Sequence, residues 1–216
     1  MNGITTKLTR REREREERIK LILDNAEKLF LEKGFAVTTM SDLGGAAEFG
    51  RATLYHYFPS KEAIYVAILE RALDSLIAKS RESVAKARTS TQKIEKLKDV
   101  LLSFVQRKRN FFHLYFITRF EVFPYLDGKL RKRLESKTKE FDEIFHEIYR
   151  EGVLKGELKP GDPLTLGDIF FAQILGLMLL NSAEILEPPL ASSVAKATGF
   201  FLDNIGIDSD GTRKKK

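Results

Sequence analysis

Residues 49–61 contain no acidic side chain and carry Arg51, His56 and Lys61, with Thr53 and Tyr55 among them. Guanidinium, imidazole and ammonium groups can donate hydrogen bonds to phosphate oxygens and to the edges of bases. Hydroxyl groups can bind phosphates in the same way. The chemistry that this stretch offers is therefore nucleic-acid binding.

The overall charge does not make this case by itself. The chain of 216 residues has a net charge of +6 and a pI near 9.4. Residues 1–70, however, contain as many acidic as basic side chains, and much of the excess comes from Arg213 and the three lysines after it. We expect residues 209–216 to form a solvated basic tail, so that DNA binding depends on local placement of charge.

Other chemistries find little support in the sequence. The three histidines, at positions 56, 113 and 146, are scattered, and there is no cysteine. No glycine-rich phosphate loop, nucleophile elbow or metal-ligand spacing is present. We therefore predict no catalytic residue, no metal and no cofactor, and hence not an enzyme. Two alternatives stay open: a metal site formed by His113 and His146, and an adaptor that binds protein through its helical faces.

The charged stretch is positioned by short helices. Apolar spacing from Ile19 onward predicts a helix that ends at Gly34, and Thr39 with Asp42 forms a capping box for a second helix. Gly50 can cap a third helix, residues 51–57. At 100° per residue, Leu54 and Phe58 of that helix point inward, while Ala52 and His56 lie on the opposite side. Three such helices with a tight second turn predict a helix-turn-helix unit.

The rest of the chain is also predicted to be helical, over residues 61–86, 94–108, 111–125, 129–154, 163–184 and 189–205. The fold class is therefore all-α, with about nine helices in total. Residues 10–18, with charges of both signs at i,i+4, predict a solvated helical extension. An alternative is that Lys7, Arg10 and Arg11 form a basic arm that follows a phosphate backbone.

Several short motifs in the N-terminal third resemble the TetR family of transcriptional repressors. They are AEKLFLEKGF (26–35), TTMSDL (38–43), TLYHYF (53–58) and PSKEAI (59–64). The resemblance covers residues 15–70 well, and the remainder matches in layout. One departure is Glu48, which stands where the family has a turn glycine, so that the turn must adopt a conformation that Glu tolerates or carry strain.

The resemblance implies a homodimer that places residues 51–57 of each subunit in successive major grooves of a palindromic operator. It implies that Arg51 and His56 contact base edges. Ala52 would allow the helix to approach the DNA closely or would contact a thymine methyl group. Thr39, Thr53, Tyr55, Tyr57 and Lys61 would contact the DNA backbone. Tyr57 could equally be a core aromatic side chain.

The resemblance also implies two domains: a DNA-binding domain over residues 1–60, with the reader unit at 39–58, and a ligand-binding and dimerisation domain over 61–208. A row of small residues would let a partner helix approach, and leucines on the preceding helix would add buried area. This interface comprises Leu175, Leu179, Ala191, Ala195 and Gly199, although the same residues could instead form an intramolecular core. An aromatic-rich pocket for a small hydrophobic effector would be lined by Phe104, Phe112, His113, Phe116, Arg119, Phe120, Phe145, Tyr149, Phe170 and Gln173. Most of these aromatic residues could instead form an ordinary core.

The longest apolar run, residues 169–180, is too short to span a bilayer and predicts a buried helix. No signal peptide is apparent at the N-terminus. We therefore expect a cytoplasmic regulator, a repressor that its effector releases from DNA, with no membrane partner.

Overall fold

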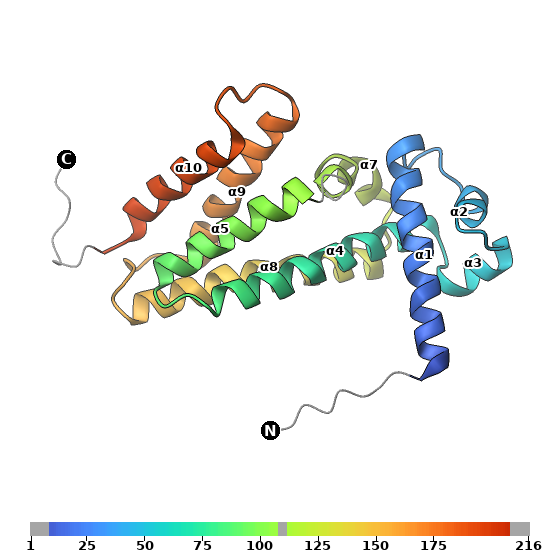
Figure 1. Ribbon diagram of the computed structural model, residues 1–216, viewed down its shortest axis with the longest axis horizontal. Helices are drawn as coiled ribbons and strands as arrows, with labels where there is room; N and C mark the ends of the chain where they lie inside the picture. Colours follow the sequence, from blue (N-terminus) through green and yellow to red (C-terminus); the bar gives the residue numbers. More distant parts are fainter. Residues whose placement is uncertain (1–8, 108–111, 208–216) are drawn as a thin grey trace. The chain divides into compact units, whose positions relative to one another are not determined.

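The computed structural model of the chain describes residues 9–107 and 112–207. These residues contain nine α-helices, a π-helical turn and a 3-10 turn, and their β-type pairing is limited to one bridge between Leu158 and Gly206. The expected all-α class is confirmed. The α-helices are α1 (Arg10–Lys33), α2 (Met40–Ala46), α3 (Arg51–Tyr57), α4 (Lys61–Val84), α5 (Ser90–Arg107), α7 (Arg119–Val122), α8 (Gly128–Leu154), α9 (Pro163–Ser182) and α10 (Leu190–Ile205) (Figure 1).

The chain divides into two compact units. The first comprises Met1–Ala72 and Arg109–Glu135, and the second comprises Leu73–Lys108 and Ser136–Lys216. Residues 61–72 thus group with the helix-turn-helix, which differs from the boundary expected at residue 60. The expected basic tail, residues 209–216, and Lys7 of the expected arm lie outside the described residues.

Helix α1 begins and ends at defined caps. The Thr9 side chain accepts a hydrogen bond from the Glu12 amide, and the Glu12 carboxylate accepts one from the Thr9 amide, which completes a capping box. The helix ends at Gly34, whose φ of 89° favours glycine. Both the helical extension and the glycine end predicted from the sequence are confirmed.

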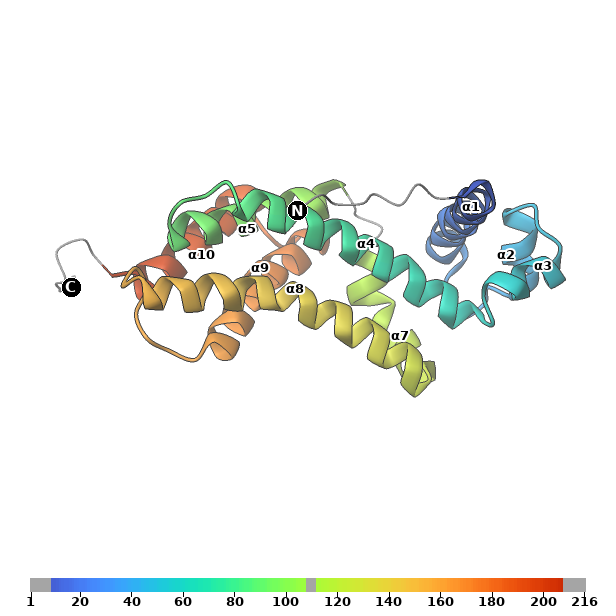
Figure 2. The same cartoon turned by 90° about the horizontal axis from the view of Figure 1, so that it is seen from below.

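Helices α2 and α3 lie side by side on one flank of α1 (Figures 1 and 2). The turn between them places Glu48 at a φ of 58°, a left-handed conformation that is costly for a side chain with a Cβ. The turn also approaches Gly44 closely: the amide of Phe49 donates a hydrogen bond to the Gly44 carbonyl at 2.8 Å. A Cβ at Gly44 would lie 2.9 Å from the Phe49 carbonyl oxygen, whereas one at Gly45 would meet nothing within 4 Å.

The N-terminal half of α4 joins the other elements of the first unit. The Tyr65 hydroxyl donates to the Leu114 carbonyl at 2.6 Å, and burial raises the pKa of this phenol. Arg71 pairs with Asp24 of α1 at 2.7 Å. A further ion pair joins Glu70 to Arg133 of α8. These contacts explain why residues 61–72 belong to the first unit.

The aromatic stretch expected as one helix over 111–125 is broken. A π-helical turn, η1 (His113–Ile117), is followed by α7 and by a 3-10 turn, η2 (Phe123–Tyr125). The Thr118 amide donates to the His113 carbonyl at 3.0 Å, one residue further back than in an α-helix. The extra residue rotates later side chains by about 100° from their expected direction. Phe120, in α7, is 83% exposed and does not face inward.

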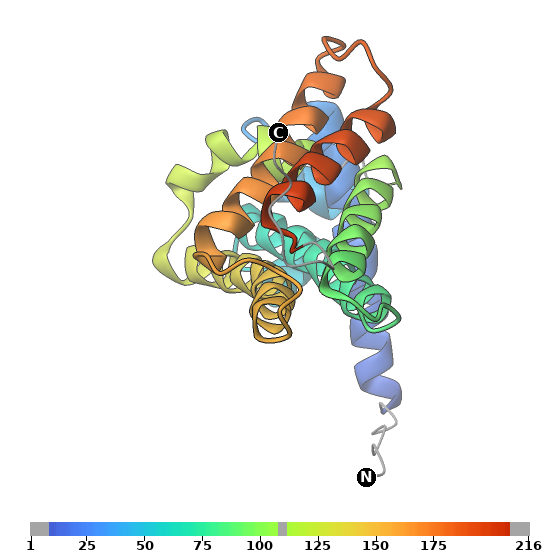
Figure 3. The same ribbon diagram turned by 90° about the vertical axis from the view of Figure 1, so that its left-hand side faces the viewer.

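The second unit has an aromatic core around Phe145. Its ring centroid lies 5.1 Å from that of Phe170, 6.1 Å from Phe201 and 6.2 Å from Tyr149. These rings come from α8, α9 and α10, and α9 and α10 lie side by side (Figure 3). Asp162 caps α9 by accepting hydrogen bonds from Leu164 and Thr165, as the Asp-Pro sequence predicts.

Helix α9 is not the buried helix that its composition predicts. Phe170, Ile174 and Met178 are buried, but Ile169 and Leu180 are 49% and 42% exposed. Among the helices of the described residues, α9 is the one long and apolar enough to cross a membrane by length and composition. The core helix of a soluble protein can have the same length and composition.

The backbone approach at Gly44 yields a stability prediction. Gly44→Ala should lower the free energy of unfolding by about 1–3 kcal/mol, because the new methyl group meets the backbone of Phe49. Gly45→Ala, its matched control, should raise it by up to about 1 kcal/mol, because alanine favours a helix interior. Urea denaturation followed by circular dichroism measures both. Equal effects of the two substitutions would contradict this account.

Candidate nucleic-acid interface

Helix α3 exposes the side that the helical wheel selects. Leu54 is fully buried and Phe58 is 9% exposed, so these two side chains fix the orientation of the helix. Arg51, Ala52 and His56 are exposed to solvent. Gly50 is the N-cap residue of α3, as predicted. The three residues expected to contact bases are therefore accessible to a ligand.

Two surface hollows flank α3, and each of the eight residues expected to contact DNA lines one of them. The first hollow, about 640 Å³, lies between α1 and α3 and is lined by Arg11, Glu14, Arg15, Arg18, Ala52, Thr53, His56 and Tyr57. The second includes residues from α2, α3 and the start of α4, among them Thr39, Arg51, Tyr55 and Lys61. The fold thus brings together residues that are 22 positions apart in the sequence, from Thr39 to Lys61.

Aromatic rings hold some of these side chains in place. The Arg51 guanidinium lies 5.7 Å from the Tyr55 ring centroid, within the range of a cation–π contact. Tyr57 is half-buried, and its ring lies 6.4 Å from Phe49 and 5.5 Å from His56. Tyr57 therefore packs within the unit and also borders the first hollow.

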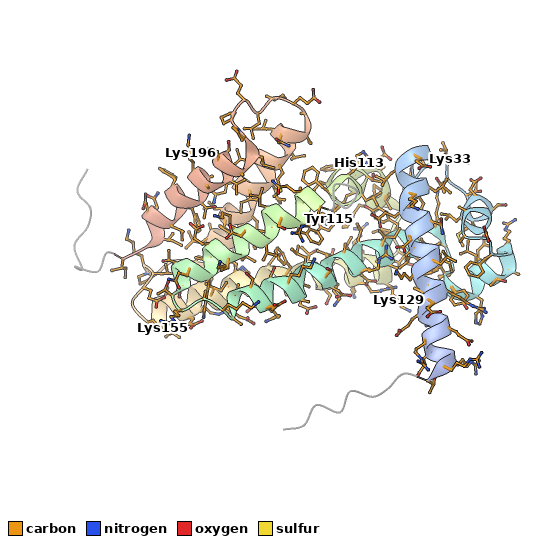
Figure 4. All side chains as sticks on the ribbon, viewed as in Figure 1. Lys33, His113, Tyr115, Lys129, Lys155 and Lys196 are labelled. Carbon is orange, nitrogen blue, oxygen red and sulfur yellow. The ribbon has the colours of Figure 1, made fainter. Side chains whose placement is uncertain are left out.

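Thr39 is committed to its helix cap. Its hydroxyl donates to Asp42 at 2.7 Å and accepts from the Asp42 amide at 3.1 Å. Lys33, at the C-terminal end of α1 (Figure 4), donates to the same carboxylate at 2.8 Å. The hydrogen bonds from Lys33 and Thr39 lower the pKa of Asp42 to about 2. The predicted capping box is confirmed, and it fixes the start of α2.

Lys61 has an intramolecular role that sequence reasoning missed. Its ammonium donates to the carbonyls of Phe35 and Ala36 at 2.9 Å each, and to that of Thr38 at 3.0 Å. An ammonium has three protons, so all its donors are used. The Phe35 ring lies 4.6 Å away and adds a cation–π contact. Lys61 therefore holds the connection between α1 and α2, and the expectation that it binds a DNA phosphate does not fit this arrangement.

Arg15 and Arg18 are the surface residues that sequence reasoning left out. Their spacing with Arg11, at i, i+4 and i+7, was available in the sequence as a single helical face. The acidic residues between them favoured the interpretation of a solvated extension. Only the fold places this face beside α3.

The residues expected to line an effector pocket have mixed environments. Phe104 and Phe112 are buried, Tyr149 and Phe170 are enclosed by other rings, and Phe145 lies at the centre of the aromatic core. His113, which is labelled in Figure 4, and Phe120 are exposed in the single chain.

The remaining pocket candidates include polar groups. Phe116 and Arg119 are partly exposed, and the Arg119 guanidinium lies 5.3 Å from the Tyr115 ring. The amide nitrogen of Gln173 is buried with no hydrogen-bond partner among the described residues. Burial also raises the pKa of Asp142 to about 6, against an opposing effect of His146. Gln173 and Asp142 are thus polar groups of the second unit, whereas Phe116 and Arg119 belong to the first.

The residues expected at a subunit interface lie on accessible surface of the single chain. Leu179 is 41% exposed, Ala191 and Ala195 are exposed, and Leu175 and Gly199 are half-buried. A Cβ at Gly199 would meet nothing within 4 Å.

The described part of the chain contains no candidate metal site, because no three His, Cys, Asp or Glu side chains lie close enough together to hold an ion. His113 Nδ1 lies 3.4 Å from the Thr118 hydroxyl, and His146 Nδ1 lies 3.2 Å from the Glu143 carboxylate.

Comparison with known proteins identifies the class. A sequence model described as "Bacterial regulatory proteins, tetR family" matches residues 22–68. The chain is 26% identical over 188 residues to the uncharacterized HTH-type transcriptional regulator YfiR of Bacillus subtilis (strain 168), covering 85% of this chain and 89% of YfiR. It is 30% identical over 138 residues to the HTH-type transcriptional repressor KstR2 of Rhodococcus jostii (strain RHA1), covering 64% of this chain and 66% of KstR2.

A solved structure has the same fold. The transcriptional regulator FadR from Bacillus subtilis, in complex with stearoyl-CoA, matches with a TM-score of 0.72 at 19% identity, over 84% of this chain and 96% of FadR. The fold is that of a helix-turn-helix protein whose third helix has an exposed side. The chain belongs to the TetR family and is a transcriptional regulator.

The role of Lys61 can be tested by stability. Lys61→Met should lower the free energy of unfolding by about 1–3 kcal/mol, because it removes three hydrogen bonds from a charged donor. Lys28→Met on the exposed side of α1 should change it by less than about 0.5 kcal/mol. Urea denaturation of both variants measures the difference. If Lys61→Met leaves stability unchanged, the carbonyl contacts do not hold the connection.

Proposed function

We propose that the protein is a dimeric repressor that binds a palindromic operator and leaves it when a small hydrophobic effector binds. The observation that carries the proposal is the exposed side of α3, where Arg51, Ala52 and His56 stand free of the core that Leu54 anchors. A protein that acts on bacterial DNA in this way works in the cytoplasm. KstR2, which is 30% identical over 138 residues, is itself named a transcriptional repressor.

In the proposed complex α3 enters the major groove. Arg51 can form two hydrogen bonds with one guanine, and His56 can donate to a base acceptor or accept from a base donor. Ala52 is small enough to contact a thymine methyl group. Thr53 and Tyr55, on the flanks, bind the sugar–phosphate backbone and fix the register.

The proposed subunit interface is formed by α9 and α10. Leu179, Leu180 and Phe200 leave 41%, 42% and 75% of their surfaces exposed in the single chain. Ala191, Ala195 and Gly199 follow one another at i+4 and allow a helix of the second subunit to approach closely. Apolar surface of this kind is stabilised by removal from water, and a two-fold axis would pair the face with its own copy.

The proposed effector carries a long acyl chain, as a thioester. Support comes from the many aromatic rings of the helical body and from the buried amide nitrogen of Gln173, which has no partner among the described residues. A carbonyl oxygen of a ligand would satisfy this donor. FadR, which shares the fold, was crystallised with stearoyl-CoA.

DNA recognition and release are tested together by selection of duplexes from a random pool and by fluorescence anisotropy on the selected duplex. The wild type should select a palindrome, and Arg51→Ala or His56→Ala should weaken binding about 10- to 100-fold, because each removes contacts to a base. Arg88→Ala, an exposed arginine outside α3, is the control of equal charge. Stearoyl-CoA should weaken binding at least about 10-fold.

Each part of the proposal can fail separately. A wild type that selects no sequence would refute operator binding. Selection without any response to acyl thioesters of different lengths would refute the effector alone.

The interface predicts a loss of dimer. Ala195→Arg should give a monomer in sedimentation analysis, because it places a charge within the apolar face of α9 and α10. Ala85→Arg, at an exposed alanine just after α4, is the matched control and should leave the mass unchanged. A dimer that survives Ala195→Arg with unchanged affinity would show that the subunits meet elsewhere.

A further inference from the structure

The first three turns of α1 make no contribution to the core. The buried residues of α1 begin at Ile22, and residues 10–18 are all exposed. The N-terminal end of the helix is nevertheless fixed, because Thr9 and Glu12 form a capping box. Figure 1 shows this part of α1 extending past α2 and α3. An extension that is capped but does not pack internally is available to bind something else.

One side of this extension carries three arginines. At 100° per residue, Arg11, Arg15 and Arg18 fall within an arc of about 60°. Within the described part of the chain, none of the three forms an ion pair with a carboxylate, although Glu14 stands at i,i+4 to Arg18. Glu14 pairs with Arg10 at 2.8 Å, the other opposite charge at four residues' spacing. The three guanidinium groups therefore keep their charge available.

The arginine side faces α3 across the first hollow. Arg11, Arg15 and Arg18 form one wall, and Ala52, Thr53 and His56 line the other. Arg15 is oriented by Tyr57, whose ring centroid lies 5.9 Å from the guanidinium carbon. Glu14 also lines the hollow, so three arginines stand against one carboxylate that is already paired. The hollow is thus positively charged and continuous with the exposed side of α3.

We propose that Arg11, Arg15 and Arg18 form a phosphate clamp, a second DNA contact that binds the backbone bordering the groove in which α3 lies. The proposal rests on the DNA-binding function proposed above. Guanidinium groups bind phosphate through paired, charge-assisted hydrogen bonds. Because they contact the backbone, the clamp adds affinity and orientation but reads no sequence. It explains how a DNA-binding segment with no net charge can attract DNA: the extension presents its basic side to the ligand and its acidic residues elsewhere.

The test is the salt dependence of binding, measured by anisotropy on the duplex that the wild type selects and on a scrambled duplex of equal length. Arg15→Gln/Arg18→Gln should make the slope of log Kd against log salt less steep by up to about 2, because each lost phosphate contact removes about 0.9. Affinity should fall roughly 10- to 100-fold on both duplexes alike. The preference for the selected duplex should stay unchanged.

The matched control removes the same charge from the opposite side of the helix. Arg13 and Lys20 are exposed and lie about 180–200° from Arg11. Arg13→Gln/Lys20→Gln should change the slope by less than about 0.5. Glutamine and arginine have similar helix propensities, and circular dichroism should confirm equal helix content in both variants.

The outcomes separate the clamp from the function on which it rests. Equal changes of slope in the two double variants would mean that only bulk charge acts. No change of slope in either variant would mean that the extension does not touch DNA. Both results overturn the clamp while the wild type still binds its selected duplex. A wild type that prefers no duplex overturns the proposed function, and the clamp with it.

Discussion

A seven-residue helix is too short to be stable in water, and the DNA-binding unit of this protein depends on how that constraint is met. Helices α2 and α3 both have this length. Their stability must come from packing and caps, since helix formation in isolation requires a longer segment. Leu54 supplies a fully buried contact for α3, and the Thr39 capping box fixes the start of α2. The reading side can be polar because the opposite side is so completely buried.

Lys61 is the point at which this support is joined to α4. It is the first residue of α4, and its ammonium binds three carbonyls of the connection between α1 and α2. Farther along the same helix, Tyr65 binds the Leu114 carbonyl and Arg71 binds Asp24. One helix therefore carries contacts to α1, to the start of α2 and to the π-helical turn. This explains why the segment 113–135 belongs to the DNA-binding unit and not to the rest of the helical body.

Individual residues show where sequence reasoning succeeded and where it failed. The direction of Leu54 and His56 followed from helical periodicity, and the glycine end of α1 and the Asp162 cap followed from local hydrogen bonding. The π-helical turn before Phe120, which is exposed, breaks the single helix expected over 111–125. The need for glycine at position 44 comes from the close approach of the Phe49 carbonyl. Neither feature has a signature at the level of residue type.

The sequence by itself determined the all-α class, the short reading helix with its exposed side, and the caps at helix ends, because these depend on neighbours within a few positions. The tertiary structure alone decided that the Lys61 ammonium is occupied by carbonyls, that the Arg15 side of α1 lies beside α3, and that α9 keeps an apolar face exposed. Each of these depends on groups that are far apart in the chain or on surface left over after packing. Periodicity gives the direction of a side chain from its own helix, but it does not give what lies in that direction.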